Sequence, residues 1–480
     1  MYDATFSLPG HTMIEHSLSV PLDRFGALSR FAADEAAAIP EKIELFAREY
    51  VRHGNEKLPR LVYFQGGPGF GGPRMAPIGS WLDTALNHYR VVLLDERGTG
   101  RSHPIEAQAV SAVGPTPVQA AFISCFRQDS IAADAEDLRL AFGGDPWSVL
   151  GQSFGGFVVT ACLSQAPQGL SEAFITAGLP SVEGCADDVY RLTYAQTDVR
   201  NREFFARYPG DESVAWSVAK HLADVEERLP TGERLTPGRF RQIGICLGRS
   251  YGLEQLHFLL EDPFWTVRGA RRLRPQFLDR IGAQVSLAPA PLYGVMHEAI
   301  YAQASTGATA WSADRIRGEF PQFRLPDVAV GAAAESELEA EGRGFRFTGE
   351  HMYPWQMRED PALAPIADAA DALAADPSLR RLYDAEALAA NGAAAEREVR
   401  AGRGDSAAHE AAVGRDATAA RRVPAAAWVY KQDMFVPYSI SMETARLAGF
   451  RTLVSDTFHH DGLHSGGPQM ILKLIEAVRG

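Results

Sequence analysis

The chain has few cysteines, no long hydrophobic run and a deficit of positive charge. Its four cysteines are scattered over 480 residues without a C-x-x-C pair, which argues against a disulfide framework or a zinc-binding cysteine cluster. No stretch approaches the roughly 18 apolar residues of a membrane-spanning helix. The net charge of −13 disfavours nucleic acid, because the phosphates would be repelled.

The N-terminal segment also lacks the features of a secretory signal, which would be a basic region followed by an apolar one. We therefore expect a soluble, cytoplasmic protein. Its apolar content of 46% is ordinary for a globular chain. Because 480 residues exceed what one hydrophobic core usually serves, we expect two domains, or one domain with a large insertion.

Short apolar runs alternate with helical segments in the first 180 residues. Residues 12–65 first suggest short antiparallel strands, and the region 117–142 has helical spacing with one charged face. The apolar runs are residues 61–64, 89–94, 147–150 and 173–177. Such alternation is typical of an α/β fold with a mostly parallel sheet and flanking helices.

A serine stands at the centre of the run Gly151-Gln152-Ser153-Phe154-Gly155, between a predicted strand and a predicted helix. A strand–turn–helix junction of this kind holds the serine hydroxyl clear of the backbone, and its glycines leave room for the sharp turn. A G-x-S-x-G run can arise by chance in a chain with 44 glycines. The surrounding pattern nevertheless favours Ser153 as a nucleophile.

After about residue 180 the alternation stops, and the chain is mainly helical, with no regular strand signal, until about residue 424. Strand-like segments return at 427–430 and 450–454, and a final amphipathic helix covers 468–478. We therefore predict a catalytic α/β-hydrolase domain formed by residues 1–180 and 425–480. A helical cap domain, residues 181–424, would be inserted over the nucleophile.

An acid and a base should follow the serine in that order, each after a later strand. Asp433 comes directly after the strand 427–430 and is the acid that we predict. Asp456 is a rival, but it lies on the same loop as the candidate bases.

Three histidines follow the last strand, and the residues alone leave open which is the base. They are His459, His460 and His464. His460 and His464 could also hold a metal, but no further ligand cluster accompanies them. We therefore predict no metal and no organic cofactor.

The oxyanion of an acyl-transfer reaction needs two convergent N–H donors. We predict the backbone N–H of Phe154, which follows the nucleophile, and that of Gly67 in the glycine-rich loop 65–72. This loop lacks the G-K-[ST] ending of a phosphate-binding loop. The charged turn 95–102 is expected to brace the site through pairing of arginine with carboxylate.

Four motifs together resemble the prolyl aminopeptidase (proline iminopeptidase) family, in its longer bacterial form. They lie at residues 65–69, 95–102, 151–156 and 460–463. The family consists of α/β-hydrolase serine peptidases that remove N-terminal proline from peptides. The resemblance implies that His460 is the base and supports Asp433 as the acid. The sequence departs from the family at His464, where an arginine is usual.

The resemblance also implies a site for the substrate amine in the inserted segment. Glu298 and Glu350 would hold the protonated imino group of the N-terminal proline, although the residues alone would suggest solvated helix faces. Phe154, Tyr353 and Trp355 are predicted walls of the proline pocket. A zinc-protease motif is absent at His297-Glu298, because the second histidine of H-E-x-x-H is missing.

These observations predict a serine aminopeptidase that acts on peptides with a free N-terminal proline and has no nucleic acid or membrane partner. The catalytic residues alone leave open another hydrolase on the same fold, such as an esterase or a tripeptidyl aminopeptidase. A non-catalytic binding protein with a hydrolase shell is a further alternative, which the set of Ser153, Asp433 and His460 disfavours. The sequence does not indicate an oligomeric state.

Overall fold

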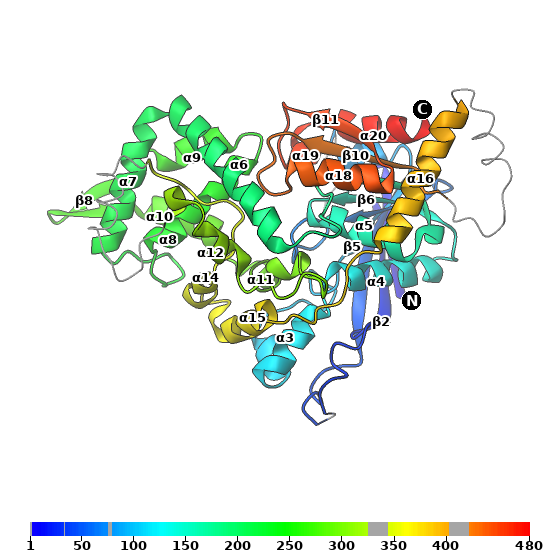
Figure 1. The fold of residues 1–480 in the computed structure, drawn as a ribbon, viewed down its shortest axis with the longest axis horizontal. Helices are drawn as coiled ribbons and strands as arrows, with labels where there is room; N and C mark the ends of the chain where they lie inside the picture. The colour runs from blue at the N-terminus through cyan, green and yellow to red at the C-terminus, as the bar shows by residue number, and fades with distance from the viewer. Residues whose placement is uncertain (1, 33, 75–78, 325–343, 403–421) are drawn as a thin grey trace.

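The computed structural model describes residues 2–32, 34–74, 79–324, 344–402 and 422–480 (Figure 1). Its centre is a nine-stranded sheet with the order β1-β2-β3-β5-β4-β6-β7-β10-β11. The strands are β1 (Tyr2–Leu8), β2 (His11–Pro21), β3 (Lys42–Arg52), β4 (Arg60–Phe64), β5 (Arg90–Asp95), β6 (Trp147–Gln152), β7 (Leu170–Thr176), β10 (Ala425–Tyr430) and β11 (Arg451–Ser455).

The six strands from β5 to β11 in this order pair in parallel, and β1 to β3 form an antiparallel extension. The α/β fold predicted from the alternation of apolar runs is confirmed. Strands β2 and β3 have 11 residues each, so this extension is longer than the short strands expected over 12–65.

Helices cover both faces of the sheet, which explains why its central strands β4, β5 and β6 are almost fully buried. Along β4, Leu61 and Tyr63 belong to one buried cluster together with α1 (Trp81–Ala85) and α20 (Gln469–Arg479). The alternate residues Val62 and Phe64 belong to the other cluster, with α3 (Thr116–Ser124), α4 (Gln128–Ala141) and α5 (Phe154–Gln165). The region 117–142 thus forms two helices. The short helix α2 (Ala107–Ala112) precedes α3.

Between β7 and β10 the chain forms mostly helices, and Figure 1 shows α6 to α12 gathered beside the sheet. The helices described between β7 and β10 are α6 (Ala186–Arg207), α7 (Pro209–Asp224), α8 (Pro237–Arg241), α9 (Gly252–Leu260), α10 (Pro275–Val285), α11 (Pro291–Val295), α12 (Ser312–Arg317), α14 (Pro354–Glu359), α15 (Ala367–Ala374) and α16 (Ala385–Gly402). Helix α15 packs on α3, and α16 packs on α5 and on α18 (Tyr438–Ala448), so this segment contacts the sheet's own helices.

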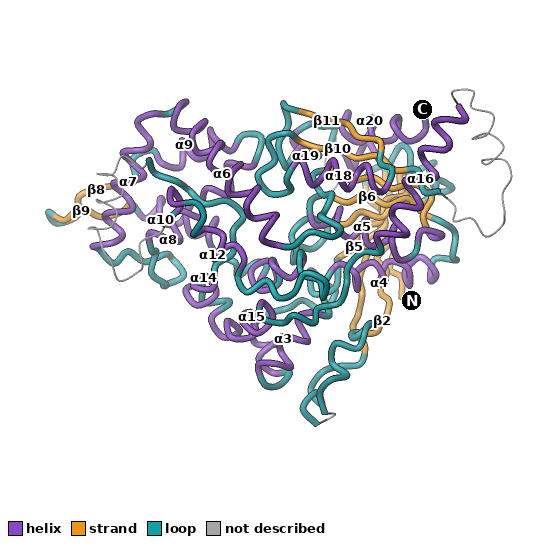
Figure 2. Tube along the Cα trace, in the orientation of Figure 1, coloured by secondary structure: helices purple, strands orange, loops and turns teal. Residues whose placement is uncertain are grey.

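One small hairpin in this region departs from the sequence-based expectation, which gave no strands there. Strands β8 (Phe264–Val267) and β9 (Ala270–Leu273) pair antiparallel, far from the main sheet (Figure 2). Most of their residues are exposed. A strand without a buried face lacks the alternation on which strand prediction depends, so the pattern gave no signal.

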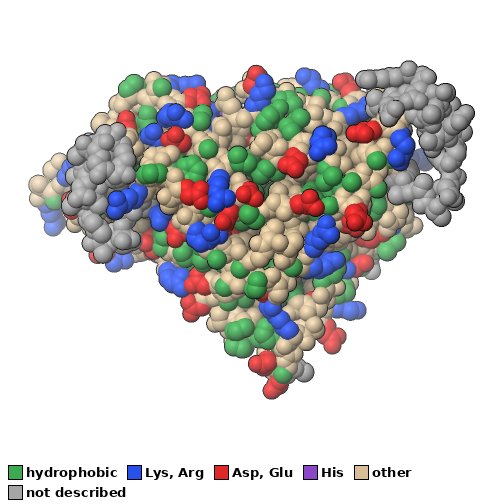
Figure 3. All heavy atoms as spheres, in the orientation of Figure 1, with side chains coloured by type: hydrophobic (Ala, Val, Ile, Leu, Met, Phe, Trp, Pro, Cys, Tyr) green, Lys and Arg blue, Asp and Glu red, His purple; other side chains and the backbone are tan. Residues whose placement is uncertain are grey.

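The described surface mixes charges of both signs. Acidic and basic side chains are interspersed on the face drawn in Figure 3. Among the described residues, no helix is long and apolar enough to cross a membrane. Nor do these residues contain a group of three or more His, Cys, Asp or Glu side chains that could hold a metal ion.

Candidate active site

Ser153 occupies the tight junction between β6 and α5. Its backbone φ of 54° and ψ of −125° lie in a region that non-glycine residues rarely adopt. A Cβ at Gly151 would lie 2.2 Å from the Gly155 carbonyl oxygen, and a Cβ at Gly155 would lie 2.1 Å from that of Phe64. The two glycines of the G-x-S-x-G run are therefore required by close backbone approach.

Hydrogen bonds link Ser153, His460 and Asp433 in one chain. The Ser153 Oγ lies 2.8 Å from His460 Nε2, and His460 Nδ1 lies 2.9 Å from Asp433 Oδ2. All three side chains are buried. Because Nδ1–H donates to the carboxylate, Nε2 is left to accept the serine proton. The backbone N–H groups of Phe435 and Val436 donate to Asp433 Oδ1 and fix the carboxylate.

The electrostatics of His460 suit a general base. Burial alone would lower the pKa of His460. The Asp433 carboxylate, with a further contribution from Glu350, outweighs burial and raises that pKa above the usual histidine value. Two opposing influences therefore leave a base that gains a proton readily, yet keeps a defined orientation.

The alternative residues lie elsewhere. Asp456 is exposed, with its carboxylate 3.9 Å from Lys431 Nζ. Burial lowers the pKa of His459 and that of His464. The structure brings only His460 of the three histidines into hydrogen-bond contact with Ser153 among the described residues.

The two predicted oxyanion donors flank the serine. Phe154 is the first residue of α5, so its N–H is not used by the helical hydrogen-bond pattern. The loop of Gly67 lies against the nucleophile, since a Cβ at the adjacent Gly66 would be 3.0 Å from Ser153 Cβ. In the described part of the chain, the Gly67 N–H has no hydrogen-bond acceptor.

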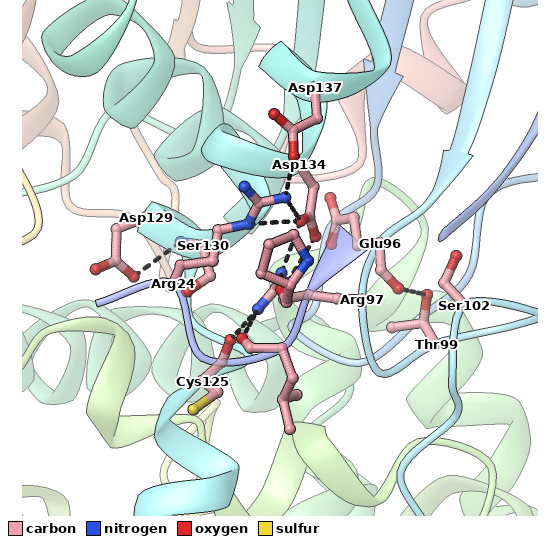
Figure 4. Close-up of polar contacts among 12 residues, drawn as sticks. Arg24, Glu96, Arg97, Thr99, Ser102, Cys125, Asp129, Ser130, Asp134 and Asp137 are labelled. Atoms are coloured by element: carbon pink, nitrogen blue, oxygen red, sulfur yellow. Dashed lines mark hydrogen bonds and ion pairs between the residues drawn. The ribbon is translucent and has the colours of Figure 1, made fainter. Parts of the chain in front are cut away.

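The turn 95–102 braces this loop, as its charge pattern indicated. Asp95 accepts a hydrogen bond from the Gly72 N–H at 2.9 Å and pairs with both terminal nitrogens of Arg74. Arg97 is fully buried and makes two 2.6 Å bonds to Asp134 (Figure 4). The expected pairing of arginine with carboxylate is thus present.

A cavity of about 480 Å³ opens onto Ser153 and His460. Its aromatic walls are Phe70, Tyr293 and Phe435. The three aromatic residues proposed from the sequence, Phe154, Tyr353 and Trp355, are not among its lining residues. Tyr353 is buried with its hydroxyl 2.8 Å from that of Tyr194.

Glu350 lies in this cavity with its carboxylate largely shielded from solvent. The Tyr293 hydroxyl donates a hydrogen bond to Glu350 Oε1, and His297 Nε2 lies 3.8 Å from Oε2. Burial lowers the pKa of His297, although the Glu350 charge opposes this. The cavity that contains the serine therefore also contains a shielded carboxylate.

Glu298 is placed differently. Its two carboxylate oxygens accept the backbone N–H groups of Ser312 and Ala313, at 2.9 and 2.8 Å, and it does not line the cavity. Burial raises the pKa of Glu298 to about 7. Glu298 and Glu350 nevertheless share neighbours. Burial, together with the charges of both glutamates, raises the pKa of Tyr190 and that of Tyr301.

Comparison with known proteins agrees with this geometry. Residues 59–258 match the family described as the α/β hydrolase fold. A proline iminopeptidase of Aeromonas sobria is 37% identical over 468 residues, covering 97% of this chain and 96% of that protein. The chain belongs to the proline iminopeptidase family. It is an α/β-hydrolase of the serine exopeptidase class.

More distant relatives cover most of the chain as well. A proline iminopeptidase of Aspergillus aculeatus is 28% identical, covering 90% of this chain and 88% of that protein. The solved proline iminopeptidase-related protein of Thermus thermophilus is 14% identical with a TM-score of 0.35, covering 96% of each chain.

Sequence reasoning missed Tyr293 and Phe435 as cavity walls. Both stand in segments to which the family resemblance had drawn attention: Tyr293 lies five residues before Glu298, and Phe435 lies two residues after Asp433. Phe435 contacts the predicted base, with its ring centroid 4.6 Å from that of His460. An aromatic residue two positions after the predicted acid was the signal that could have identified it.

Proposed function

We propose that the chain releases N-terminal proline from peptides through a prolyl-Ser153 intermediate. The observation that carries this proposal is the hydrogen-bonded chain from Ser153 through His460 to Asp433, in a cavity that also holds Glu350. The kinship with proline iminopeptidases supports the choice of substrate.

In the first half of the proposed reaction, His460 takes the proton of Ser153 as the Oγ attacks the carbonyl carbon of the N-terminal proline. The N–H groups of Phe154 and Gly67 donate to the resulting oxyanion, and each such donor is worth roughly 3 kcal/mol of transition-state stabilisation. His460 then gives its proton to the departing amine, and the carbon–nitrogen bond breaks. Water, activated by His460, hydrolyses the prolyl ester.

Recognition of the substrate amine is assigned mainly to Glu350. A carboxylate inside a partly desolvated cavity binds a protonated imino group by charge-assisted hydrogen bonds. Glu298 is proposed to contribute a second negative charge from outside the cavity lining. Its charge acts on Tyr190 and Tyr301, on which the Glu350 charge also acts. Since the pKa of Glu298 is about 7, this contribution grows as the pH rises through neutrality.

The proposal assigns different roles to two parts of the chain. Residues 1–180 and 425–480 would act as the catalytic domain, and residues 181–424 as a cap that supplies the amine-binding groups. Support comes from the cavity lining, where Ser153 and His460 meet Tyr293, Glu350 and the α10 end from the inserted segment.

Three substrates test the proposal: proline arylamide, its N-acetylated analogue and an aryl ester without a free amine. We expect rapid turnover of the free proline arylamide alone. Ester cleavage without proline amide cleavage would contradict the substrate assignment. Glu350→Gln should lower kcat/KM for the free amine about 10- to 100-fold, as loss of a charged hydrogen bond predicts. Unchanged discrimination against the N-acetyl analogue in this variant would contradict the role of Glu350.

A further inference from the structure

Arg249 lines the cavity that contains Ser153 and His460, and its side chain has no hydrogen-bond or ion-pair partner among the described residues. It is exposed and lines the same cavity as Ser153 and His460. Its guanidinium makes no hydrogen bond, ion pair or ring contact with any residue that the structure describes. None of the five N–H donors of this guanidinium bonds to a described residue. They are therefore available to a ligand.

The chain on both sides of Arg249 is attached to the loop of the base. The His460 N–H donates to the Gly248 carbonyl oxygen at 3.2 Å. On the other side, the Ser250 N–H and hydroxyl both donate to Asp461 Oδ1, at 2.9 and 2.7 Å. These bonds hold Arg249 over the loop that carries His460.

This position fixes which half of the substrate Arg249 can reach. His460 must give its proton to the departing amine, so the leaving peptide lies on the histidine side of Ser153. The proline ring and its imino group lie on the other side of the scissile bond, which is the side assigned to Glu350. Arg249 is therefore placed beside the residue that follows the proline.

Two further titratable side chains, Asp461 and His464, line the same cavity. The Asp461 carboxylate is already engaged by Ser250. Burial lowers the pKa of His464, although the Asp461 charge opposes this, so this side chain is harder to protonate than an ordinary histidine. The cavity lining thus includes the Glu350 carboxylate on the side assigned to the cationic amine and the Arg249 guanidinium, which can bind an anionic group.

We infer that Arg249 binds the C-terminal carboxylate of dipeptide substrates of the form Pro-Xaa. In a dipeptide this carboxylate is separated from the departing amine nitrogen by a single carbon atom, so it lies close to His460 during proton transfer. Guanidinium and carboxylate match as bidentate hydrogen-bonding partners. The inference deepens the proposed function and rests on it, and it makes short peptides the preferred substrate class.

The test compares Pro-Ala with Pro-Ala amide, which differ only in the terminal carboxylate. We expect the wild-type kcat/KM to be about fivefold higher for the acid, the effect of a charge-assisted bond partly open to solvent. Arg249→Gln should bring the ratio close to one, while Arg249→Lys should retain part of it. Arg280→Gln removes an exposed arginine of α10 outside this cavity and should leave the ratio unchanged. The wild-type preference should shrink at high salt.

The outcomes separate this inference from the proposed function. If the wild type cleaves neither compound, the proposed function fails. If it cleaves both and Arg249→Gln lowers both kcat/KM values equally, Arg249 has a structural role and the inference fails. A preference for Pro-Glu amide over Pro-Gln amide, without one for Pro-Ala over its amide, would overturn the assignment to the C-terminal carboxylate.

Discussion

At Ser153, a strained backbone and a polar neighbour act on the same hydroxyl. The positive φ holds the side chain at the junction of β6 and α5, and His460 Nε2 lies 2.8 Å from its Oγ. Neither feature alone makes a serine nucleophilic, because the hydroxyl needs both an exposed position and a base. Strained backbone of this kind persists only where the surrounding structure holds it in place, and it is concentrated at active sites.

Ser153→Ala should lower kcat/KM for proline arylamide by roughly 10⁴-fold or more, since the covalent route is lost. Folding should be preserved, because the change removes one small, buried oxygen. Initial rates over a range of substrate concentrations, together with a thermal melt, check both points. Near-native turnover in this variant would contradict the covalent mechanism.

The pH profile of kcat/KM should have an acid limb set by His460, which must be neutral to act as a base. Asp433 and Glu350 raise the pKa of His460, so activity should fall as the pH decreases through a value above that of an ordinary histidine. Glu350→Gln removes a negative charge that favours the imidazolium. We therefore expect the acid limb to move to lower pH.

The control for this profile is Asp456→Asn, which removes an exposed carboxylate from the loop that carries the base. We expect its acid limb to stay where the wild-type limb lies. A Glu350→Gln profile with an unshifted limb, or one shifted to higher pH, would contradict the assigned coupling between Glu350 and His460.

The sequence predicted some of these residues better than others, for a physical reason. Ser153 has a local signature of glycines, and Asp433 directly follows a buried strand. The placement of Glu298 was not predictable, because its partners Ser312 and Ala313 are reached only through the folded backbone. Arg249 gave no signal either, since its position depends on contacts between segments about 210 residues apart.

At the scale of elements, the loops at the carboxyl ends of β4 and β5 form one braced unit. Asp95 fixes Gly72, and Arg97 ties the following turn to α4 through Asp134. Arg97 also donates to the carbonyl oxygens of Leu22 and Cys125. The glycine-rich loop is thus held from behind by a buried ionic network.

Arg97→Met should lower the free energy of unfolding by about 3 kcal/mol, the low end for breaking a buried ion pair. The low end applies because Arg24 also bonds to Asp134 and would compensate for part of its charge. Denaturant titration gives the value. Arg101→Met is the matched control, because its ion pair with Glu15 is half exposed, and it should cost less than about 1 kcal/mol. Equal losses in the two variants would contradict the bracing role of Arg97.

The elements themselves were predictable where both faces are buried. Strands β4 and β6 are buried along almost their whole length because helices cover both sides of the sheet. The hairpin β8–β9 has little buried surface, so no pattern marked it. The break between α3 and α4 was also missed, because the turn at Cys125–Arg127 interrupts the helix without a proline or glycine.

At the scale of the whole molecule, the active-site cavity draws on distant parts of the chain. Ser153 follows β6 and His460 follows β11. Glu350 and Arg249 come from the segment between β7 and β10. The His460 N–H donates to the Gly248 carbonyl oxygen and the Ser250 N–H donates to Asp461, so hydrogen bonds join these parts directly. The segment that carries Arg249 and the loop that carries His460 are therefore held in a fixed relation to each other.

The central claim is that an activated Ser153 faces a subsite for a free prolyl amine. An irreversible serine-directed phosphonate, followed by peptide mapping, tests it most directly. We expect a label on Ser153 alone, with labelling slowed by a non-hydrolysable prolyl peptide but not by its N-acetylated form. Labelling of another residue, or equal protection by the two peptides, would contradict it.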